Sequence, residues 1–221
     1  SDRPESHSTL GYDSSLRFES ITRTFEMSIL NRIEQHFQDH AALIQKSLDV
    51  LAEPLQQGID LLFNTISNNG KVLACGNGGS AADAQHFIAE LVGRFERERF
   101  PLAGVALNTD TSIMTAVGND YGFDQVFERQ VRALAQPADL LVAISTSGNS
   151  TNVIRAIDAA KEYDIPIIAL TGRNGGTIGQ MLTSNDVHLC VPHERTMRIQ
   201  EVHILLLHIL CDGLDAAILG D

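Results

Sequence analysis

The spacing of apolar positions changes near residue 70. From about residue 28 to residue 51, apolar residues recur at mostly three- and four-residue steps, as one face of an α-helix requires. Pro54 is expected to interrupt this helix, and a second helical run leads to Asn69-Gly70, a suitable C-terminal stop. Residues 1–27 are polar and lack a clear period, so we expect an N-terminal arm that is either mobile or foreign to the natural chain, followed by one domain over residues 28–221.

After Gly70, short apolar runs alternate with segments of helical length. The runs are continuous rather than alternating and end in small or polar residues, which indicates parallel strands covered on both faces. The predicted fold class is therefore α/β, with a central parallel sheet between helices, as in flavodoxin-like or Rossmann-like three-layer sandwiches, and with additional N-terminal helices. The clearest later helices are expected at residues 81–95, 152–163 and 197–219. The expected strands are residues 71–75, 102–107, 140–145, 167–171 and 187–191.

Composition and charge narrow the class of protein. The 221 residues suit one domain, and the net charge of −12 disfavours a general nucleic-acid or anionic-membrane surface. No stretch approaches the roughly 18 apolar residues of a membrane span. Cys75, Cys190 and Cys211 match no metal-binding spacing and are interpreted as reduced thiols. We therefore expect a cytoplasmic protein with neither a membrane nor a nucleic acid as direct partner.

A glycine-rich loop, Cys75-Gly76-Asn77-Gly78-Gly79-Ser80, follows the first expected strand and opens a helix. Ligands of such sheets bind beyond the carboxyl ends of the strands. Three glycines let the backbone approach a ligand closely, which suits an anion or a polar sugar. The loop also satisfies the dinucleotide pattern G-x-G-x-x-A, a weak signal alone, and a tight turn without a ligand is a further alternative.

A hydroxyl-rich loop, Ser145-Thr146-Ser147-Gly148-Asn149-Ser150, follows the third expected strand and also enters a helix. Four hydroxyls and the backbone amides of a helix N-terminus can hold a phosphate without any cation. Any single serine here can instead be a simple helix cap. The sequence lacks Gly-Lys-Ser/Thr, which excludes a nucleoside-triphosphate loop.

Other polar groups lie after the second strand and on two expected helices. Asn119 and Asp120 lie between glycines, where they can bind sugar hydroxyls or simply form a turn. His86 and Glu90 are four residues apart, so they share a helix face and can bind a metal, transfer protons or form an ordinary surface pair. Gln200 and His208 are eight residues apart in an apolar helix, and they can meet one ion only by leaning together or in a site between chains.

The motifs CGNGGSAADAQHF, GNDYGF, ISTSGNS, ALTGRNGG and RIQEVHILLLHIL, in this order, resemble the sugar isomerase (SIS) domain family from about residue 28 to the C-terminus. The resemblance implies a parallel α/β sandwich, a homotetramer with active sites near subunit contacts, and one zinc ion per subunit. The implied reaction converts D-sedoheptulose 7-phosphate to D-glycero-D-manno-heptose 7-phosphate by an aldose–ketose isomerisation, which serves the synthesis of ADP-heptose for the lipopolysaccharide core.

The same resemblance implies roles for individual residues. Glu90 and His208 are the implied catalytic pair that moves the proton between C1 and C2 of the sugar. The implied zinc ligands are His86, Glu90, Gln200 and His208. The implied substrate contacts are Asn77, Gly78, Gly79, Ser80, Glu90, Asn119, Asp120 and Gln200 for the sugar, and Ser145, Thr146, Ser147 and Ser150 for the phosphate.

The alternative is a non-catalytic regulator of the same fold that binds the bacterial replication initiator protein. Several motifs here, including AQHF, RFE and QVRAL, resemble that regulator as well. The regulator pattern keeps the phosphate loops but lacks the acid–base pair, whereas this chain has both Glu90 and His208. A protein without proton transfer has no chemical reason to retain both groups, which favours the isomerase.

Overall fold

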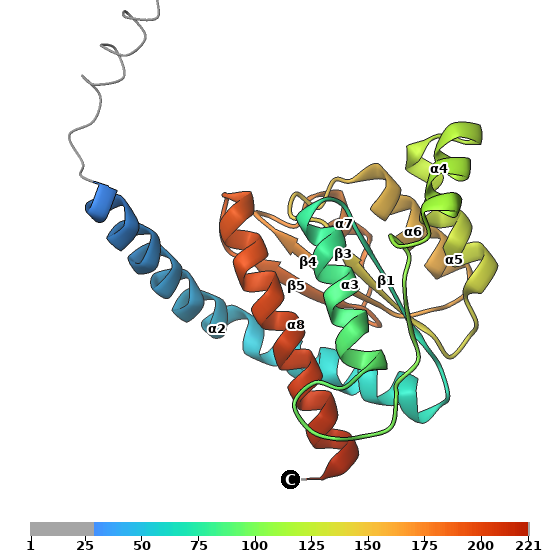
Figure 1. Ribbon diagram of the computed structural model, residues 1–221. Coiled ribbons are helices and arrows are strands. Elements are labelled where there is room, and N and C mark those ends of the chain that lie inside the picture. The colour runs from blue at the N-terminus through green and yellow to red at the C-terminus, as the bar shows by residue number, and fades with distance from the viewer. Residues whose placement is uncertain (1–28, 221) are drawn as a thin grey trace, which may run out of the picture. The chain divides into compact units, whose positions relative to one another are not determined.

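The computed structural model describes residues 29–220, and a parallel β-sheet lies at the centre of residues 42–220 (Figure 1). The strand order is β2-β1-β3-β4-β5, and every neighbouring pair is parallel. β1 lies between β2 and β3, so the chain continues on one side of β1 to β2 and later on its other side to β3. The loops that follow β1 and β3 are therefore neighbours. All five expected strands are confirmed, with bounds β1 Val72–Gly76, β2 Gly104–Ala106, β3 Leu140–Ile144, β4 Ile167–Gly172 and β5 Val187–Val191.

Helices cover both faces of the sheet, as the continuous apolar strands predicted (Figure 1). Successive residues of β1 point to opposite faces: Val72 and Ala74 pack with α2, α3 and α8, whereas Leu73 and Cys75 pack with α5, α6 and α7. The result is a three-layer α/β domain. The helices are α2 Ile29–Ser67, α3 Gly79–Val92, α4 Thr111–Asp120, the 3-10 helix η1 Phe123–Gln125, α5 Glu128–Leu134, α6 Thr151–Glu162, α7 Gly176–Met181 and α8 Thr196–Leu219.

Pro54 does not interrupt the first helix, contrary to the sequence-based expectation. Helix α2 continues through it from Ile29 to Ser67. Proline removes one backbone hydrogen bond and leaves the carbonyl four residues earlier, that of Val50, without its helical donor. Buried leucines on both sides, Leu51 and Leu55, hold the helix on the core. Tertiary packing therefore outweighs the local cost of the proline.

Contrary to the expectation from the sequence, one segment does reach the length and apolar composition of a membrane span, namely helix α8. Ten of its residues are buried, among them Val202, Leu206 and Leu210, and they pack against the sheet, α2 and α3. This is the pattern of a core helix. Two polar residues of this apolar helix have partners: Glu201 pairs with Arg198, and the His203 ring lies 2.8 Å from the carbonyl oxygen of Thr171.

The buried His203 is expected to make stability depend on pH. Its side chain is fully buried, and this burial lowers its pKa from 6.5 to about 4, against the opposing effect of the bond to Thr171. The unfolded chain then binds a proton that the folded chain excludes, so stability is complete above about pH 6.5 and falls as the pH drops towards 4. The limit of this loss is roughly 3 kcal/mol. Urea unfolding at pH 7.5 and pH 5, compared with His203→Gln, measures it; equal pH dependence in both proteins would contradict the assignment.

Candidate active site

The glycine loop after β1 is shaped by close contacts of its backbone. A β-carbon on Gly76 would lie 2.6 Å from the carbonyl oxygen of Ser80, and Gly78 has a positive φ of 56°. A β-carbon on Gly79 would lie 2.5 Å from Nε2 of Gln200. Glycine at position 79 therefore gives the side chain of Gln200, from the first turns of α8, access to the start of α3.

The hydroxyl loop after β3 folds around Gly148, whose φ is +66°. The hydroxyls of Ser145 and Ser150 are 2.9 Å apart, and Ser147 Oγ accepts a hydrogen bond from the backbone N–H of Asn149. Ser150 occupies the N-cap position of α6, but its side chain makes no capping bond. The interpretation of Ser150 as a simple cap therefore fails, and its hydroxyl at the start of α6 contacts that of Ser145 instead.

The two loops are held together. Gly76 and Ile144 are partners in the β1–β3 register, so both loops leave the same edge of the sheet. Across this edge the side-chain amides of Asn77 and Asn152 exchange two hydrogen bonds of 2.8 Å. Asn108, which follows β2, donates from its side chain to the carbonyl oxygen of Gly76. Asn108 and Asn152 were not identified as site residues from the sequence. Their positions shortly after β2 and after the hydroxyl loop were the signal that could have indicated them.

Helices α3 and α8 bring His208 to His86 and Glu90, although His208 is 122 positions from His86 in the sequence. His86 Nε2 lies 3.2 Å from Glu90 Oε1 and 2.9 Å from His208 Nε2. The ring of Phe95 lies against His208, with 5.6 Å between ring centroids. His86 is the most exposed of the group, and Glu90 is half-buried. His86 thus links a carboxylate on its own helix to an imidazole on α8, and groups of these types can transfer protons.

Asp83 belongs to the same helix face and was missed in the sequence. It lies three residues before His86, a spacing at which side chains on a helix are neighbours. Burial raises the pKa of Asp83 to about 6, although the nearby His86 lowers it, and its Oδ2 is buried without a hydrogen bond. This carboxyl adds negative charge beside the imidazole of His86 once it ionises.

The predicted metal ligands meet only in part. In the portion of the chain from residue 29 to residue 220, no three His, Cys, Asp or Glu side chains are grouped so that they could hold a metal ion. His86 contacts both Glu90 and His208, whereas the amide of Gln200 lies against Gly79. The donor types nevertheless suit zinc, because two imidazole nitrogens face each other beside a carboxylate.

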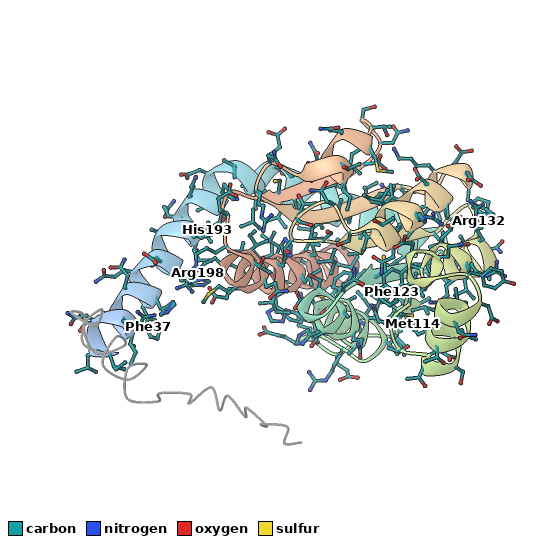
Figure 2. The ribbon with its side chains drawn as sticks, turned by 90° about the horizontal axis from the view of Figure 1, so that it is seen from above. Phe37, Met114, Phe123, Arg132, His193 and Arg198 are labelled. Carbon is teal, nitrogen blue, oxygen red and sulfur yellow. The ribbon has the colours of Figure 1, made fainter. Side chains whose placement is uncertain are left out.

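Asn119 and Asp120 are not in a loop, as the flanking glycines suggested, but in the last turn of α4. Both are exposed, and the amide of Asn119 donates to Oδ1 of Asp120. Helix α4 has no buried residue and packs against η1; Figure 2 shows Met114 of α4 and Phe123 of η1 on this side of the domain. The structure shows these two residues bonded to each other rather than to the glycine and hydroxyl loops.

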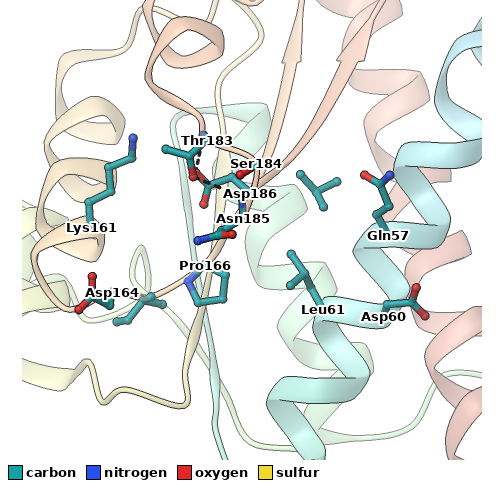
Figure 3. Close-up of a pocket in the computed structure, with 12 residues that line it drawn as sticks. Gln57, Asp60, Leu61, Lys161, Asp164, Pro166, Thr183, Ser184, Asn185 and Asp186 are labelled. Carbon is teal, nitrogen blue, oxygen red and sulfur yellow. Dashed lines mark hydrogen bonds between the residues drawn. The ribbon is translucent and has the colours of Figure 1, made fainter.

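A cavity of about 750 Å³ lies elsewhere, where β4 and β5 begin (Figure 3). Two of its charged side chains make hydrogen bonds within the protein: Lys161 donates to the carbonyl oxygen of Met181, and Asp186 accepts from Thr183. None of the predicted site residues lines it. Chemistry in parallel sheets is built at the carboxyl ends of strands, so we place the candidate site at the loops after β1 and β3. The cavity is lined by Gln57, Asp60, Leu61, Lys161, Asp164, Ile165, Pro166, Thr183, Ser184, Asn185, Asp186 and Val187.

Comparison with known proteins gives the family. A family model described as SIS domain matches residues 35–172. The chain belongs to the SIS domain family. The matched residues include the glycine loop, the hydroxyl loop, His86 and Glu90, whereas Gln200 and His208 on α8 lie beyond them.

Several relatives of this SIS domain chain are named phosphoheptose isomerase. Phosphoheptose isomerase from Bordetella avium is 66% identical over 195 residues, which cover 88% of this chain and 99% of that protein. The solved structure of phosphoheptose isomerase GmhA from Neisseria gonorrhoeae matches with a TM-score of 0.82 and 55% identity, over 86% of this chain and all of that one. A phosphoheptose isomerase structure from Francisella tularensis matches with a TM-score of 0.83 and 40% identity, over 86% and 99%.

Proposed function

We propose that this SIS domain chain is an enzyme that catalyses the phosphoheptose isomerase reaction, from D-sedoheptulose 7-phosphate to D-glycero-D-manno-heptose 7-phosphate. The observation that carries the proposal is the contact of Glu90, His86 and His208 across helices α3 and α8. Both helices also border the glycine loop, since Gln200 lies against Gly79. The names of the relatives at 40–66% identity point to the same reaction. They give no support to the alternative of a replication-initiator regulator.

The reaction requires one proton to leave C1 of the ketose and one to be added at C2. Glu90 is the proposed base for this transfer, through an enediol or enediolate, because it is half-buried yet in contact with a partner that can share a proton. His208 is the proposed acid at the carbonyl or ring oxygen. Its imidazole lies 2.9 Å from that of His86, which places it beside the contact between His86 and Glu90.

The substrate is proposed to lie between the two loops. Ser145, Thr146, Ser147 and Ser150 bind the phosphate together with the first-turn amides of α6, and no cation is needed at this end. The glycine loop, with Asn77, Gly78, Gly79 and Ser80, faces the sugar. Gln200 reaches the same loop. Asn119 and Asp120 are proposed sugar contacts as well; this requires α4 to approach the loops when the sugar is bound.

The proposal includes one zinc ion per subunit, held by His86, Glu90, Gln200 and His208. When bound, the ion would stabilise negative charge on the carbonyl oxygen of the substrate. A carboxylate tightly bound to a metal is a weaker base, so the two roles of Glu90 compete. Metal analysis of the purified protein, with activity before and after chelation and zinc return, decides between a catalytic and an organising ion.

We propose a cytoplasmic homotetramer in which the reaction supplies the heptose precursor of lipopolysaccharide. Exposed apolar side chains on α8, Met197, Leu205 and Ile209, offer a surface for another subunit. The N-terminal residues 1–27 were expected to form a polar arm; this expectation lies outside the described residues. The net charge of −12 continues to argue against direct binding of nucleic acid.

The decisive experiment incubates the purified, metal-analysed protein with sedoheptulose 7-phosphate and follows the aldose by NMR. The expected result is the appearance of the anomeric proton signals of the heptose, which arise from C1 of the aldose. Stabilisation of the protein by the sugar phosphate without any product would instead indicate a binding domain, and capture of the replication initiator in a pulldown would indicate the regulator.

Ser147→Ala is expected to weaken substrate binding more than it slows turnover. The variant removes a hydroxyl from the phosphate loop but leaves Glu90 and His208 unchanged. KM should therefore rise at least about tenfold, in line with about 1.5–3 kcal/mol for a hydrogen bond to a charged group. Steady-state kinetics with the heptulose phosphate measure this split. Ser184→Ala, in the loop before β5, is the matched control, and an unchanged KM in Ser147→Ala would argue against the phosphate assignment.

A further inference from the structure

The amides of Asn77 and Asn152 form a closed, reciprocal pair between the two site loops. Asn77 Nδ2 donates to Asn152 Oδ1, and Asn152 Nδ2 donates to Asn77 Oδ1, both at 2.8 Å. The two residues are 75 positions apart in the sequence. Asn77 lies in the glycine loop directly after β1, and Asn152 is the second residue of α6, two positions after the last residue of the hydroxyl loop.

Burial makes this pair costly to disturb. Asn152 is 3% exposed, so its amide has little access to water that could replace Asn77. Rotating one amide alone would place N–H against N–H and oxygen against oxygen. Asn152 thereby determines the orientation of the Asn77 amide, that is, on which side its nitrogen and its oxygen lie. Each amide uses one N–H and one oxygen lone pair in the pair, so Asn77 keeps a second N–H for a ligand.

We propose that Asn152 is a positioning residue that orients Asn77 toward the sugar and joins the sugar loop to the phosphate loop. The inference rests on the proposed function, since it concerns the same substrate. Asn152 itself need not touch the substrate. A phosphate seated at the start of α6 holds the helix turn that carries Asn152, and the pair transmits this restraint to Asn77. The Asn108 side chain, bonded to the carbonyl oxygen of Gly76, braces the same loop from the β2 side.

Asn152→Ala should separate sugar binding from phosphate binding. The variant leaves the serine hydroxyls and the α6 amides in place, so the inhibition constant of inorganic phosphate should change less than about threefold. Without its partner, Asn77 loses its orientation, and kcat/KM for sedoheptulose 7-phosphate should fall about 10- to 100-fold, the range of a lost buried hydrogen-bonding partner. Loss of stability alone would not produce this difference between the two ligands.

Asn152→Asp tests the donor–acceptor pattern of the pair. A protonated carboxyl presents one donor and one acceptor, as the amide does, whereas an ionised carboxylate presents only acceptors and repels Oδ1 of Asn77. Burial favours the protonated form of the introduced carboxyl. The ratio of variant to wild-type kcat/KM should therefore rise as the pH is lowered from 8 to 5.5. The same ratio for Asn152→Ala should stay constant.

Ile157→Val on the same helix is the matched control, because it removes a methyl group from a fully buried side chain without touching the pair. It should leave both ligand constants unchanged. Wild-type kcat/KM in Asn152→Ala, parallel loss of phosphate and sugar-phosphate binding, or a flat pH ratio in Asn152→Asp would each overturn the inference. If the wild-type protein itself shows no turnover, the proposed reaction fails separately, and the pair is then judged by thermal stabilisation with sedoheptulose 7-phosphate against inorganic phosphate.

Discussion

Glu90→Gln is expected to abolish isomerisation while largely sparing sugar-phosphate binding. The amide keeps the size and one acceptor oxygen of the carboxylate but cannot accept a proton from C1 of the sugar. Positioned acid–base groups contribute about 10²–10⁴ in rate, so kcat should fall by at least that range. The phosphate end of the substrate is bound by the hydroxyl loop, on other elements of the domain, and its contribution to affinity should remain. Aldose formation by NMR and thermal stabilisation by the heptulose phosphate measure the two effects separately.

The control for this variant is Glu162→Gln. Glu162 is an exposed glutamate at the end of α6 that pairs with Arg132, so the change has the same chemistry at a surface pair (Figure 2 labels Arg132). Its kcat should equal that of the wild type. Full activity in Glu90→Gln would contradict the proposed role of Glu90 as the base. Loss of binding together with turnover would show that Glu90 acts mainly by holding the substrate or the metal and not as the base.

The layers of the fold were predictable because they follow from local patterns. Continuous apolar runs such as 140–145 are buried on both faces in a parallel sheet, and glycine or hydroxyl residues at their ends mark the functional edge. Pro54 was misread because a local rule was applied where packing of Leu51 and Leu55 prevails. Asn119 and Asp120 were misread because flanking glycines suggested a loop, whereas Asp110 caps a helix that runs to Asp120 by accepting from Ile113.

The assembly of the site was not predictable from spacing on one helix. Gln200 and His208 are eight residues apart on α8, which suggested that they could share an ion only by leaning together or between chains. The structure places Gln200 beside Gly79 and His208 beside His86, so two points on α8 meet two points on α3 that are seven residues apart. The two helices pack side by side (Figure 1). This packing depends on the tertiary structure and cannot be predicted from the sequence of either helix alone.

The same two helices are tied at their other end by a buried ion pair, which restrains the relative position of the proposed catalytic groups. The Arg99 side chain has no exposure and donates to Asp215 of α8 at 2.6 Å. It also donates to the backbone carbonyls of Glu90 and Leu91, where α3 ends. One guanidinium thus satisfies carbonyls at the C-terminus of α3 and a carboxylate of α8.

Arg99→Met is accordingly expected to cost about 3–5 kcal/mol of unfolding free energy, the usual loss when one partner of a buried pair is removed. The carboxylate of Asp215 would stay buried without its cation, the carbonyl of Glu90 would lose the guanidinium as its donor, and that of Leu91 would keep only the backbone N–H of Leu102. The double variant Arg99→Met with Asp215→Leu should recover a large part of the loss, because no isolated charge remains. Urea unfolding of the three proteins gives the comparison. Arg132→Met, at an exposed pair, should change stability little. A single variant as stable as the wild type, or a double variant less stable than the single one, would show that the link between α3 and α8 lies elsewhere.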